Sequence, residues 1–247
     1  MLIWRPRSRS ISRATTNYSQ TIELLSRAKC FDSAPLGMTV LTVPILPPDM
    51  EKFQTLHSAA IPLPLENIDT DQIIPARFLK ATTREGFGEN LFRDWRCNAD
   101  GTPKPDFVFN NPRYAGKILL AGKNFGCGSS REHAAWALYD AGFRVVISSY
   151  FADIFRGNAL NTGLLPLQVT DAELRFLFAL VEQDADTQFV VNLPEQTLHV
   201  PATGNSFHFD LDAYKKECLI NGYDDIDYLV SQKPAIEAYE QTRTWNW

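Results

Sequence analysis

The sequence has few cysteines, and they are widely separated. Its 247 residues contain no C-x-x-C pair and no closely spaced histidine that would complete a zinc or iron–sulfur ligand set. At about one cysteine per sixty residues, the chain also lacks the cysteine density of a disulfide-stapled secreted domain. We therefore expect no metal site built by this chain alone, reduced thiols and a cytoplasmic location. The four cysteines are Cys30, Cys97, Cys127 and Cys218.

The sequence also lacks long apolar runs and an excess of positive charge. No run approaches the roughly 18 consecutive apolar residues of a membrane-spanning helix. The 24 basic and 29 acidic residues give a net charge of −5, which disfavours nonspecific binding to nucleic acid or to an anionic membrane. With 45% hydrophobic residues, the chain has enough apolar material for a folded core. We expect small molecules or proteins as its partners.

The first 49 residues differ from the rest in charge. Residues 1–49 carry six basic and three acidic side chains, whereas residues 50–247 carry 18 basic and 26 acidic ones. The first 22 residues hold no acid and are rich in Arg, Ser and Thr, a composition typical of an organelle transit peptide. The alternatives are a disordered extension or a start site called too early, and we favour these. The folded domain is then expected to span residues 50–247.

The middle of the chain predicts an α/β fold. Residues 117–121 (KILLA) and 143–147 (FRVVI) have the apolar pattern of buried strands, and residues 131–141 between them have that of a helix. A second helix over 152–160 and a third strand over 164–169 extend this βαβ unit. Because helical crossovers join parallel strands, at least three strands should be parallel.

A capped helix, an antiparallel meander and a helical tail are expected to follow. Thr170 is the predicted helix N-cap, and Glu173 completes a capping box. Residues 188–210 hold three short alternating or apolar stretches separated by turn residues, which favours an antiparallel meander. The composition of residues 211–221 and 226–240 is mostly that of helices.

The segment 124–135, NFGCGSSREHAA, carries the clearest chemistry. It lies between a predicted strand and a predicted helix, so its two glycines would form a tight turn that places Ser129 and Ser130 at the helix N-terminus. Unpaired backbone N–H groups and the positive end of the helix dipole attract anions there. Arg131 adds a planar fork of donors suited to a carboxylate. The segment therefore predicts an anion site.

An ordinary helix cap is the alternative interpretation, with one serine as N-cap and Arg131 as a solvated first-turn residue. Three details favour the anion site: a cap needs only one hydroxyl, two glycines exceed what a simple turn needs, and a cation in the first turn opposes the dipole unless an anion offsets it. His133 is expected to support the site, with Glu132 as a candidate partner. The dinucleotide loop, the phosphate loop and the nucleophile elbow do not match this segment.

Two further segments hold candidate functional residues. In residues 67–75 (NIDTDQIIP), Asp69 and Asp71 crowd among turn-forming residues, a pattern that local Asx turns also explain. In residues 84–95 (REGFGENLFRDW), two glycines flank Phe87. This second pattern predicts a mobile loop with an aromatic tip, and such loops often act as lids.

At NIDTDQIIPARFL, GFGENLF, NFGCGSSREHAAWAL and SSYFADIFRGNALNTGLLPL, the sequence resembles the small subunits of 3-isopropylmalate dehydratase, in the aconitase superfamily. The resemblance runs from about Met50 to the C-terminus, and the four motifs occur in the family's order. It implies a swivelling β/β/α domain that closes over a larger subunit. That subunit would carry a four-iron four-sulfur cluster, and this chain would bind no cofactor itself.

The resemblance also implies a reaction. The heteromeric enzyme would isomerise 2-isopropylmalate and 3-isopropylmalate through 2-isopropylmaleate, in leucine biosynthesis. The open iron of the cluster would help the substrate hydroxyl to leave, while a base on this subunit removes a proton from the adjacent carbon. Cys127 takes a family cysteine position but is not expected to be a cluster ligand.

Residue by residue, the resemblance places the base on Ser129 and assigns the substrate carboxylate to Ser130 and Arg131. Arg84 is the candidate for a further family arginine that comes from a more variable loop. That loop, residues 84–92, would meet the side group of the substrate. Three residues are expected to support the site without touching the substrate: His133, Asp69 and Asp71.

Two other functions stay open at this point. A paralogous small subunit that acts on another 2-alkylmalate would share these motifs. A non-catalytic anion-binding module would need the glycine turn and the arginine but no partner and no turnover.

Overall fold

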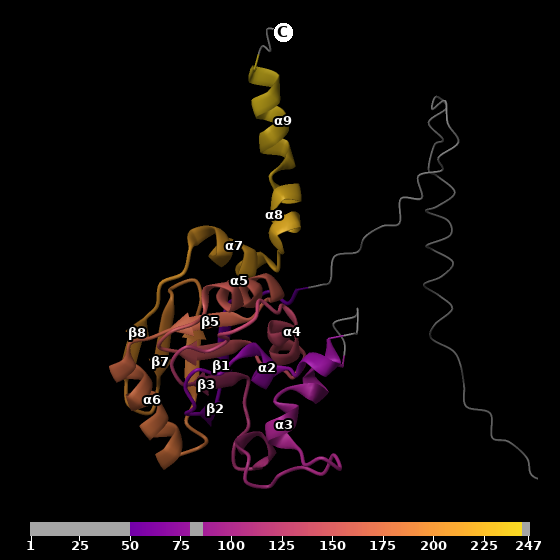
Figure 1. Cartoon of the computed structure of the whole chain (residues 1–247). Coiled ribbons are helices and arrows are strands. Elements are labelled where there is room, and N and C mark those ends of the chain that lie inside the picture. The colour runs from indigo at the N-terminus through magenta and orange to yellow at the C-terminus, as the bar shows by residue number, and fades with distance from the viewer. Residues whose placement is uncertain (1–49, 80–85, 244–247) are drawn as a thin grey trace, which may run out of the picture. The chain divides into compact units, whose positions relative to one another are not determined.

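The structure is a computed structural model that describes residues 50–79 and 86–243 (Figure 1). These residues form two four-stranded sheets, one parallel and one antiparallel, with helices packed against them. The mixed α/β class expected from the sequence is confirmed. The predicted extension, residues 1–49, lies outside the described residues.

The parallel sheet has the strand order β2-β3-β4-β5 and carries the βαβ unit. The three predicted parallel strands are confirmed, and a fourth, which the sequence pattern did not reveal, pairs with β3 at the edge. All residues of β3 and β4 are buried, because apolar side chains on both faces are covered. The strands are β2 (Ala60–Leu63), β3 (Ile118–Ala121), β4 (Val145–Ser148) and β5 (Leu165–Gln168).

Two helices, α4 (His133–Asp140) and α5 (Asp153–Thr162), connect β3 to β4 and β4 to β5. The helix predicted from residue 131 begins two residues later. The backbone N–H of Arg131 donates to the carbonyl of Ser129 at 2.8 Å, a tight turn that is incompatible with a helix starting there. Glu132 is therefore the N-cap of α4, and the expectation that the two serines occupy the helix N-terminus is wrong.

The antiparallel sheet has the order β1-β6-β7-β8, and its last three strands form the predicted meander. Its strands are β1 (Thr55–Ser58), β6 (Phe189–Asn192), β7 (Thr197–Val200) and β8 (Asn205–His208). Helix α6 (Asp171–Gln183) precedes them, and its predicted capping box between Thr170 and Glu173 is confirmed. This helix packs its apolar face into the core between the sheets.

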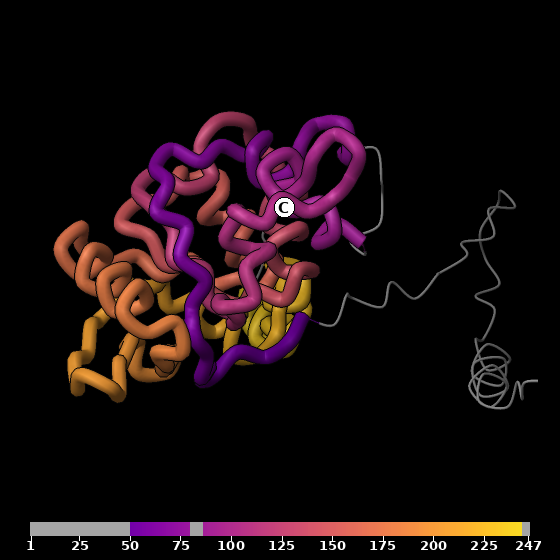
Figure 2. Tube along the Cα trace, turned by 90° about the horizontal axis from the view of Figure 1, so that it is seen from below, coloured from indigo at the N-terminus to yellow at the C-terminus, as the bar shows by residue number. Residues whose placement is uncertain are grey.

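Successive side chains along the parallel strands point to opposite faces of the sheet, and this divides the interior into two cores. Ile118 and Leu120 face the core shared with α6 and the antiparallel sheet, whereas Leu119 and Ala121 face the core formed with α4 and α5. Figure 2 shows β6 to β8 and α6, in orange, on one side of the parallel sheet and residues 86–116, in magenta, on the other. The candidate loops described below lie along the carboxyl edge of this central layer.

Residues 86–116 form a cap of short helices over the second core. Phe92 stacks on Trp95 at 5.5 Å between ring centroids, and Phe109 lies 5.0 Å from Phe92 and 5.6 Å from Phe143. The short helices here and in the preceding described segment are α2 (Thr70–Ile73), η1 (Ala76–Phe78), η2 (Gly88–Asn90), α3 (Arg93–Arg96) and η3 (Val108–Asn110).

The predicted lid is wrong for the described part of its loop, residues 86–95. Phe87 is only 3% exposed, and its ring packs against His133 and Trp136. The N–H of Gly88 donates to Asp140 Oδ2 at 2.7 Å, and a Cβ at Gly88 would lie 2.6 Å from a backbone nitrogen of the α4 terminus. The glycine permits close packing here, so the aromatic residue belongs to the core.

The helical tail is confirmed as α7 (Ala213–Asn221), α8 (Asp225–Ser231) and α9 (Lys233–Thr242). Helix α7 buries Cys218 and Leu219, and the N–H of Phe53 donates to the carbonyl of Leu219 at 2.9 Å. Neither α8 nor α9 buries a residue. Among the helices of the described chain, none combines the length and the apolar character needed to cross a bilayer.

Candidate functional site

Three loops meet at the carboxyl edge of the parallel sheet, where ligands of α/β proteins usually bind. We call residues 124–131 the serine loop. On one side, the N–H of Gly126 donates to the carbonyl of Ile68 at 2.8 Å, in the loop after β2. On the other side, in the loop after β4, the N–H of Phe125 donates to the carbonyl of Tyr150 and the N–H of Ala152 donates to the carbonyl of Phe125, each at 3.1 Å. The serine loop is therefore fixed between its two neighbours.

Both glycines of the serine loop adopt backbone conformations that favour glycine. Gly126 has φ of 76° and Gly128 has φ of 87°, so the predicted tight turn is confirmed. A Cβ at Gly126 would lie 2.2 Å from the ring of Phe155, whereas a Cβ at Gly128 would lie 3.3 Å from that of Asp69. Gly126 is thus required both for its conformation and for its lack of a side chain.

Ser129 and Ser130 are exposed at the end of this turn. The carbonyl of Ser129 accepts a hydrogen bond from Thr70 Oγ1 at 2.9 Å, which ties its backbone to α2. Neither serine hydroxyl forms a hydrogen bond with the part of the chain that the structure describes. The site therefore presents two accessible hydroxyls on a backbone that is held in place.

Thr70 was not among the residues that the sequence singled out, although it lies between two that were. Its hydroxyl is buried, and it reaches across 59 residues of sequence to the serine loop. The only local signal was its place in a segment rich in turn-forming residues. That pattern does not reveal a partner so far away in the chain.

Arg131 is paired with Asp71. Its Nη1 donates to Asp71 Oδ1, and the arginine side chain is 19% exposed while that of the aspartate is 54% exposed. The hydrogen bond from Arg131 holds the pKa of Asp71 below its usual range. The structure thus brings together two predicted site residues that lie 60 positions apart.

Asp69 has a different role from Asp71. Its Oδ1 accepts from the N–H of Gln72 at 2.7 Å, and its own N–H donates to Gln72 Oε1 at 2.9 Å, which makes it the N-cap of α2 with a full capping box. Burial, followed by the charge of Asp69, raises the pKa of Cys127. That thiol is therefore neutral at pH 7, unlike the thiolate form in which cysteine binds metals.

His133 opens α4 and lies among aromatic rings. Its ring centroid is 4.6 Å from that of Trp136 and 5.3 Å from that of Phe87. Glu132, its candidate partner, accepts a hydrogen bond from Trp136 Nε1 at 3.1 Å. This cluster joins the first turn of α4 to residues 86–92 behind the serine loop. The remaining candidate, Arg84, lies outside the described residues.

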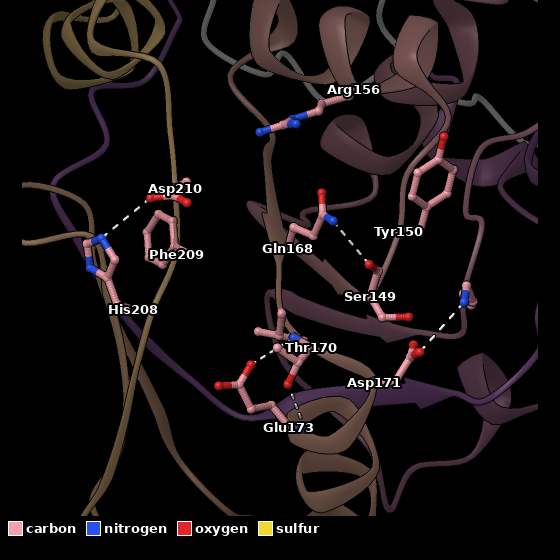
Figure 3. Close-up of a pocket in the computed structure, with 12 residues that line it drawn as sticks. Ser149, Tyr150, Arg156, Gln168, Thr170, Asp171, Glu173, His208, Phe209 and Asp210 are labelled. Carbon is pink, nitrogen blue, oxygen red and sulfur yellow. Dashed lines mark hydrogen bonds and ion pairs between the residues drawn. The ribbon is translucent and has the colours of Figure 1, made fainter.

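A hollow of about 630 Å³ lies farther along the same edge of the sheet, beyond β4 and β5 (Figure 3). Two ion pairs lie in its lining: Lys123 Nζ lies 3.6 Å from Asp171 Oδ2, and His208 Nε2 lies 3.7 Å from Asp210 Oδ1. Sequence reasoning missed this hollow because five separate segments line it. Ser129 and Arg131 do not line it, so we assign the chemistry to the serine loop.

Residues 50–79 and 86–243 contain no group of three or more His, Cys, Asp or Glu side chains that could hold a metal ion. Cys97, Cys127 and Cys218 are free thiols. The donors in this part of the chain therefore do not fit an iron–sulfur cluster, which would need several thiolates around one centre.

Comparisons with known proteins agree on one family. The model of the aconitase C-terminal domain matches residues 50–172. The 3-isopropylmalate dehydratase small subunit of Cytophaga hutchinsonii is 65% identical over 193 residues, which are 78% of this chain and 96% of that protein. The protein of the same name from Christiangramia forsetii is 60% identical over 194 residues, 78% of this chain and 95% of that protein.

A solved structure shares the fold. The crystal structure of 3-isopropylmalate dehydratase from Methanocaldococcus jannaschii aligns with a TM-score of 0.56 at 25% identity. The alignment covers 75% of this chain and 99% of that one.

Proposed function

The chain belongs to the family of 3-isopropylmalate dehydratase small subunits, hydro-lyases of the aconitase superfamily, and on this premise we propose that, together with a larger subunit, it isomerises 2-isopropylmalate and 3-isopropylmalate through 2-isopropylmaleate. The name of the relatives, small subunit, implies a larger partner subunit. The observation that carries the proposal is that the exposed Ser129 and the Asp71-paired Arg131 lie two residues apart on a loop fixed from both sides.

Arg131 would bind a carboxylate of the substrate. A guanidinium offers five N–H donors in a rigid plane and can grip a carboxylate through two parallel hydrogen bonds. The contact with Asp71 uses Nη1, so the fork is oriented before the substrate arrives. Ser130, adjacent and exposed, would add a hydroxyl donor to the same carboxylate.

Ser129 would move the proton. In the dehydration, the C–H bond next to the hydroxyl-bearing carbon would break and its proton would go to the alkoxide of Ser129, while the C–O bond breaks and the hydroxyl leaves as hydroxide to give 2-isopropylmaleate. Transfer of that proton from Ser129 to the hydroxide would complete the water molecule that is lost and restore the alkoxide. Addition of water in the opposite orientation returns the proton to carbon. A serine hydroxyl is a weak base in water, so the proton-accepting form is an alkoxide that nearby positive charge must stabilise. Arg131 is the described cation closest in sequence that could do so.

The larger subunit would hold the iron–sulfur cluster, since the described donors of this chain do not fit one. When bound there, the cluster supplies a Lewis acid for the substrate hydroxyl. The part of the reaction assigned to this chain is the binding of the dicarboxylate and the handling of the proton.

Reconstitution tests this function. The purified chain alone should be inactive, and adding the cluster-loaded larger subunit from the same genome should restore interconversion of the two isopropylmalates, followed by chromatography of the products. The larger subunit alone is the control. Turnover by this chain without a partner, or no turnover of isopropylmalate by the reconstituted pair, would contradict the proposal. Turnover of a different 2-alkylmalate in its place would assign the chain to a paralogous enzyme.

A further inference from the structure

The last two helices expose an unusual amount of apolar surface. We call residues 225–242, which form α8 and α9, the C-terminal arm. Five of the eight large apolar side chains that are exposed in the described chain lie on this arm, each 46% to 65% exposed. In Figure 1 both helices lie beyond the two sheets. The five residues are Ile226, Leu229, Val230, Ile236 and Tyr239.

Helices as short as these are not expected to be stable by themselves. Helix α8 has seven residues and α9 has ten, and neither buries a side chain within the described domain. Isolated helices of fewer than about 12 residues are marginal in water, and most helical stability in proteins comes from packing of an apolar face. Clustered exposed apolar residues of this kind usually mark an interaction surface.

The base of the arm is firmly attached to the domain. Asp225, the first residue of α8, accepts hydrogen bonds from Tyr214 at 2.5 Å and from Lys215, both on α7. Its other carboxylate oxygen accepts from Asn161 Nδ2 at 3.0 Å, near the end of α5. The ring of Tyr228 packs edge-on against Tyr214 at 4.5 Å. The domain thus holds the first residues of the arm in place but does not cover the arm's apolar side chains.

Helix α5 links the first residues of the arm to the serine loop. Helix α5 holds Asn161 near its C-terminal end, and it begins immediately after Ala152, whose N–H donates to Phe125 of the serine loop at 3.1 Å. A protein that bound the arm would therefore be held in a defined relation to Ser129. The proposed reaction needs such a relation, because it requires a second chain beside this loop.

The charges argue against a second copy of this chain as the occupant. The arm carries four acidic side chains and one basic one, Lys233, which already lies 3.7 Å from Glu237 on the same helix. The whole chain has a net charge of −5, so two arms would repel each other as they approach. The complementary surface is apolar with basic side chains at its rim.

We propose that the C-terminal arm docks onto the larger subunit, with its exposed apolar side chains in an apolar groove that has a basic rim. The inference rests on the proposed function, which supplies this partner.

A paired set of variants tests the docking surface. Leu229→Asp combined with Ile236→Asp places two charges in the apolar face, whereas Ser231→Asp combined with Gln241→Asp adds the same charge at exposed polar positions of the same arm. The dissociation constant of each full-length variant for the immobilised, cluster-loaded larger subunit is measured. We expect at least a hundredfold weaker binding for the apolar-face variant, and less than a threefold change for the control. All variants should keep the circular dichroism and thermal unfolding of the unmodified protein.

Hydrogen exchange provides a second readout that needs no substitution. Backbone amides of residues 225–242 should exchange at least tenfold more slowly when the larger subunit is bound. Unchanged exchange, or equal binding by the apolar-face variant, overturns the arm as the docking surface and leaves the proposed function standing. If the unmodified chain does not bind the larger subunit, both proposals fail. If the chain alone sediments as a dimer and the apolar-face variant as a monomer, a second copy covers the arm instead.

Discussion

Two glycine-containing loops that look alike in sequence have opposite surroundings in the structure. The serine loop, residues 124–131, ends in exposed hydroxyls at the edge of the sheet. The phenylalanine loop, residues 86–92, buries Phe87, Leu91 and Phe92 at 3% exposure or less. Both contain a G-x-G pattern. Only the first presents hydroxyl groups at the surface.

The difference lies in what each glycine provides. In the serine loop, Gly126 and Gly128 have positive φ and turn the chain so that the serines face outward. In the phenylalanine loop, Gly86 also has a positive φ, of 82°, but the buried Phe87 follows it, and Gly88 provides space, because a Cβ there would lie 2.6 Å from the backbone nitrogen of Ala141. A glycine pattern therefore indicates a functional loop only when polar side chains follow the turn. Where aromatic residues surround it, close packing is the better interpretation.

The largest effect is expected from Ser129→Ala in the reconstituted enzyme. Loss of a positioned proton-transfer group typically lowers kcat by roughly 100- to 10,000-fold. Because the side chain is exposed, thermal unfolding and binding to the larger subunit should not change. Ser206→Ala, an exposed serine on β8, is the matched control. Near-normal turnover of the Ser129 variant would remove this residue from the mechanism and weaken the contrast between the two loops.

Alanine substitutions at the glycines separate the need for a positive φ from the need for space around the backbone. Gly126→Ala meets both a positive φ and the Phe155 ring, so we expect a loss of about 2–5 kcal/mol in the free energy of unfolding. Gly88→Ala meets a backbone collision and should lose about 1–3 kcal/mol. Gly157→Ala, exposed within α5 with nothing within 4 Å, is the control and should stabilise the protein by up to about 1 kcal/mol.

Urea unfolding of the three variants measures these differences. An unchanged stability for Gly88→Ala would show that the phenylalanine loop is not packed in solution, and would restore the interpretation of this loop as a mobile lid. An equally stable Gly126→Ala would show that the serine loop can adopt another turn.

Sequence reasoning predicted the elements whose signals are local. The buried strands β3, β4 and β5 are continuous apolar runs, and α6 starts with a capping box within four residues. Strands β1 (TLHS) and β2 (AIPL) were missed because polar residues in the first and a proline in the second interrupt the apolar pattern, and each is defined by its pairing with a distant strand. Their stabilising partners are not visible in the local pattern.

Contacts between residues far apart in the sequence also limited what could be predicted about the site. The residue types and the glycine turn of the serine loop could be predicted, but the pairing of Arg131 with Asp71 and of Thr70 with the Ser129 carbonyl depends on two loops meeting at one sheet edge. The start of α4 was also misplaced, because a serine before a helical pattern is typical of an N-cap. The turn from Ser129 to Arg131 instead keeps the hydroxyls ahead of the helix.

Arg131→Lys should raise KM for the isopropylmalates by about tenfold and change kcat less, because an ammonium group cannot reproduce the planar two-pronged contact with a carboxylate. Arg77→Lys is the control, since Arg77 also pairs with an aspartate, Asp94, but lies outside the serine loop. The control should leave KM unchanged. If both substitutions changed KM equally, the surface charge and not the serine loop would bind the substrate.

The smallest expected effect concerns Cys127, which lies between the two turn glycines. Burial and the charge of Asp69 raise its pKa above that of an ordinary thiol, so a smaller fraction is thiolate at any pH near neutrality. Its alkylation by iodoacetamide at pH 7.5, followed by peptide mass spectrometry, should be several-fold slower than that of an unstructured cysteine peptide, and should rise with pH over a higher range. Asp69→Asn keeps a good N-cap for α2 but removes the charge, so it should partly restore the rate. Alkylation at the peptide's rate in the unmodified protein would mean that the serine loop is open in solution, and not held between its neighbours.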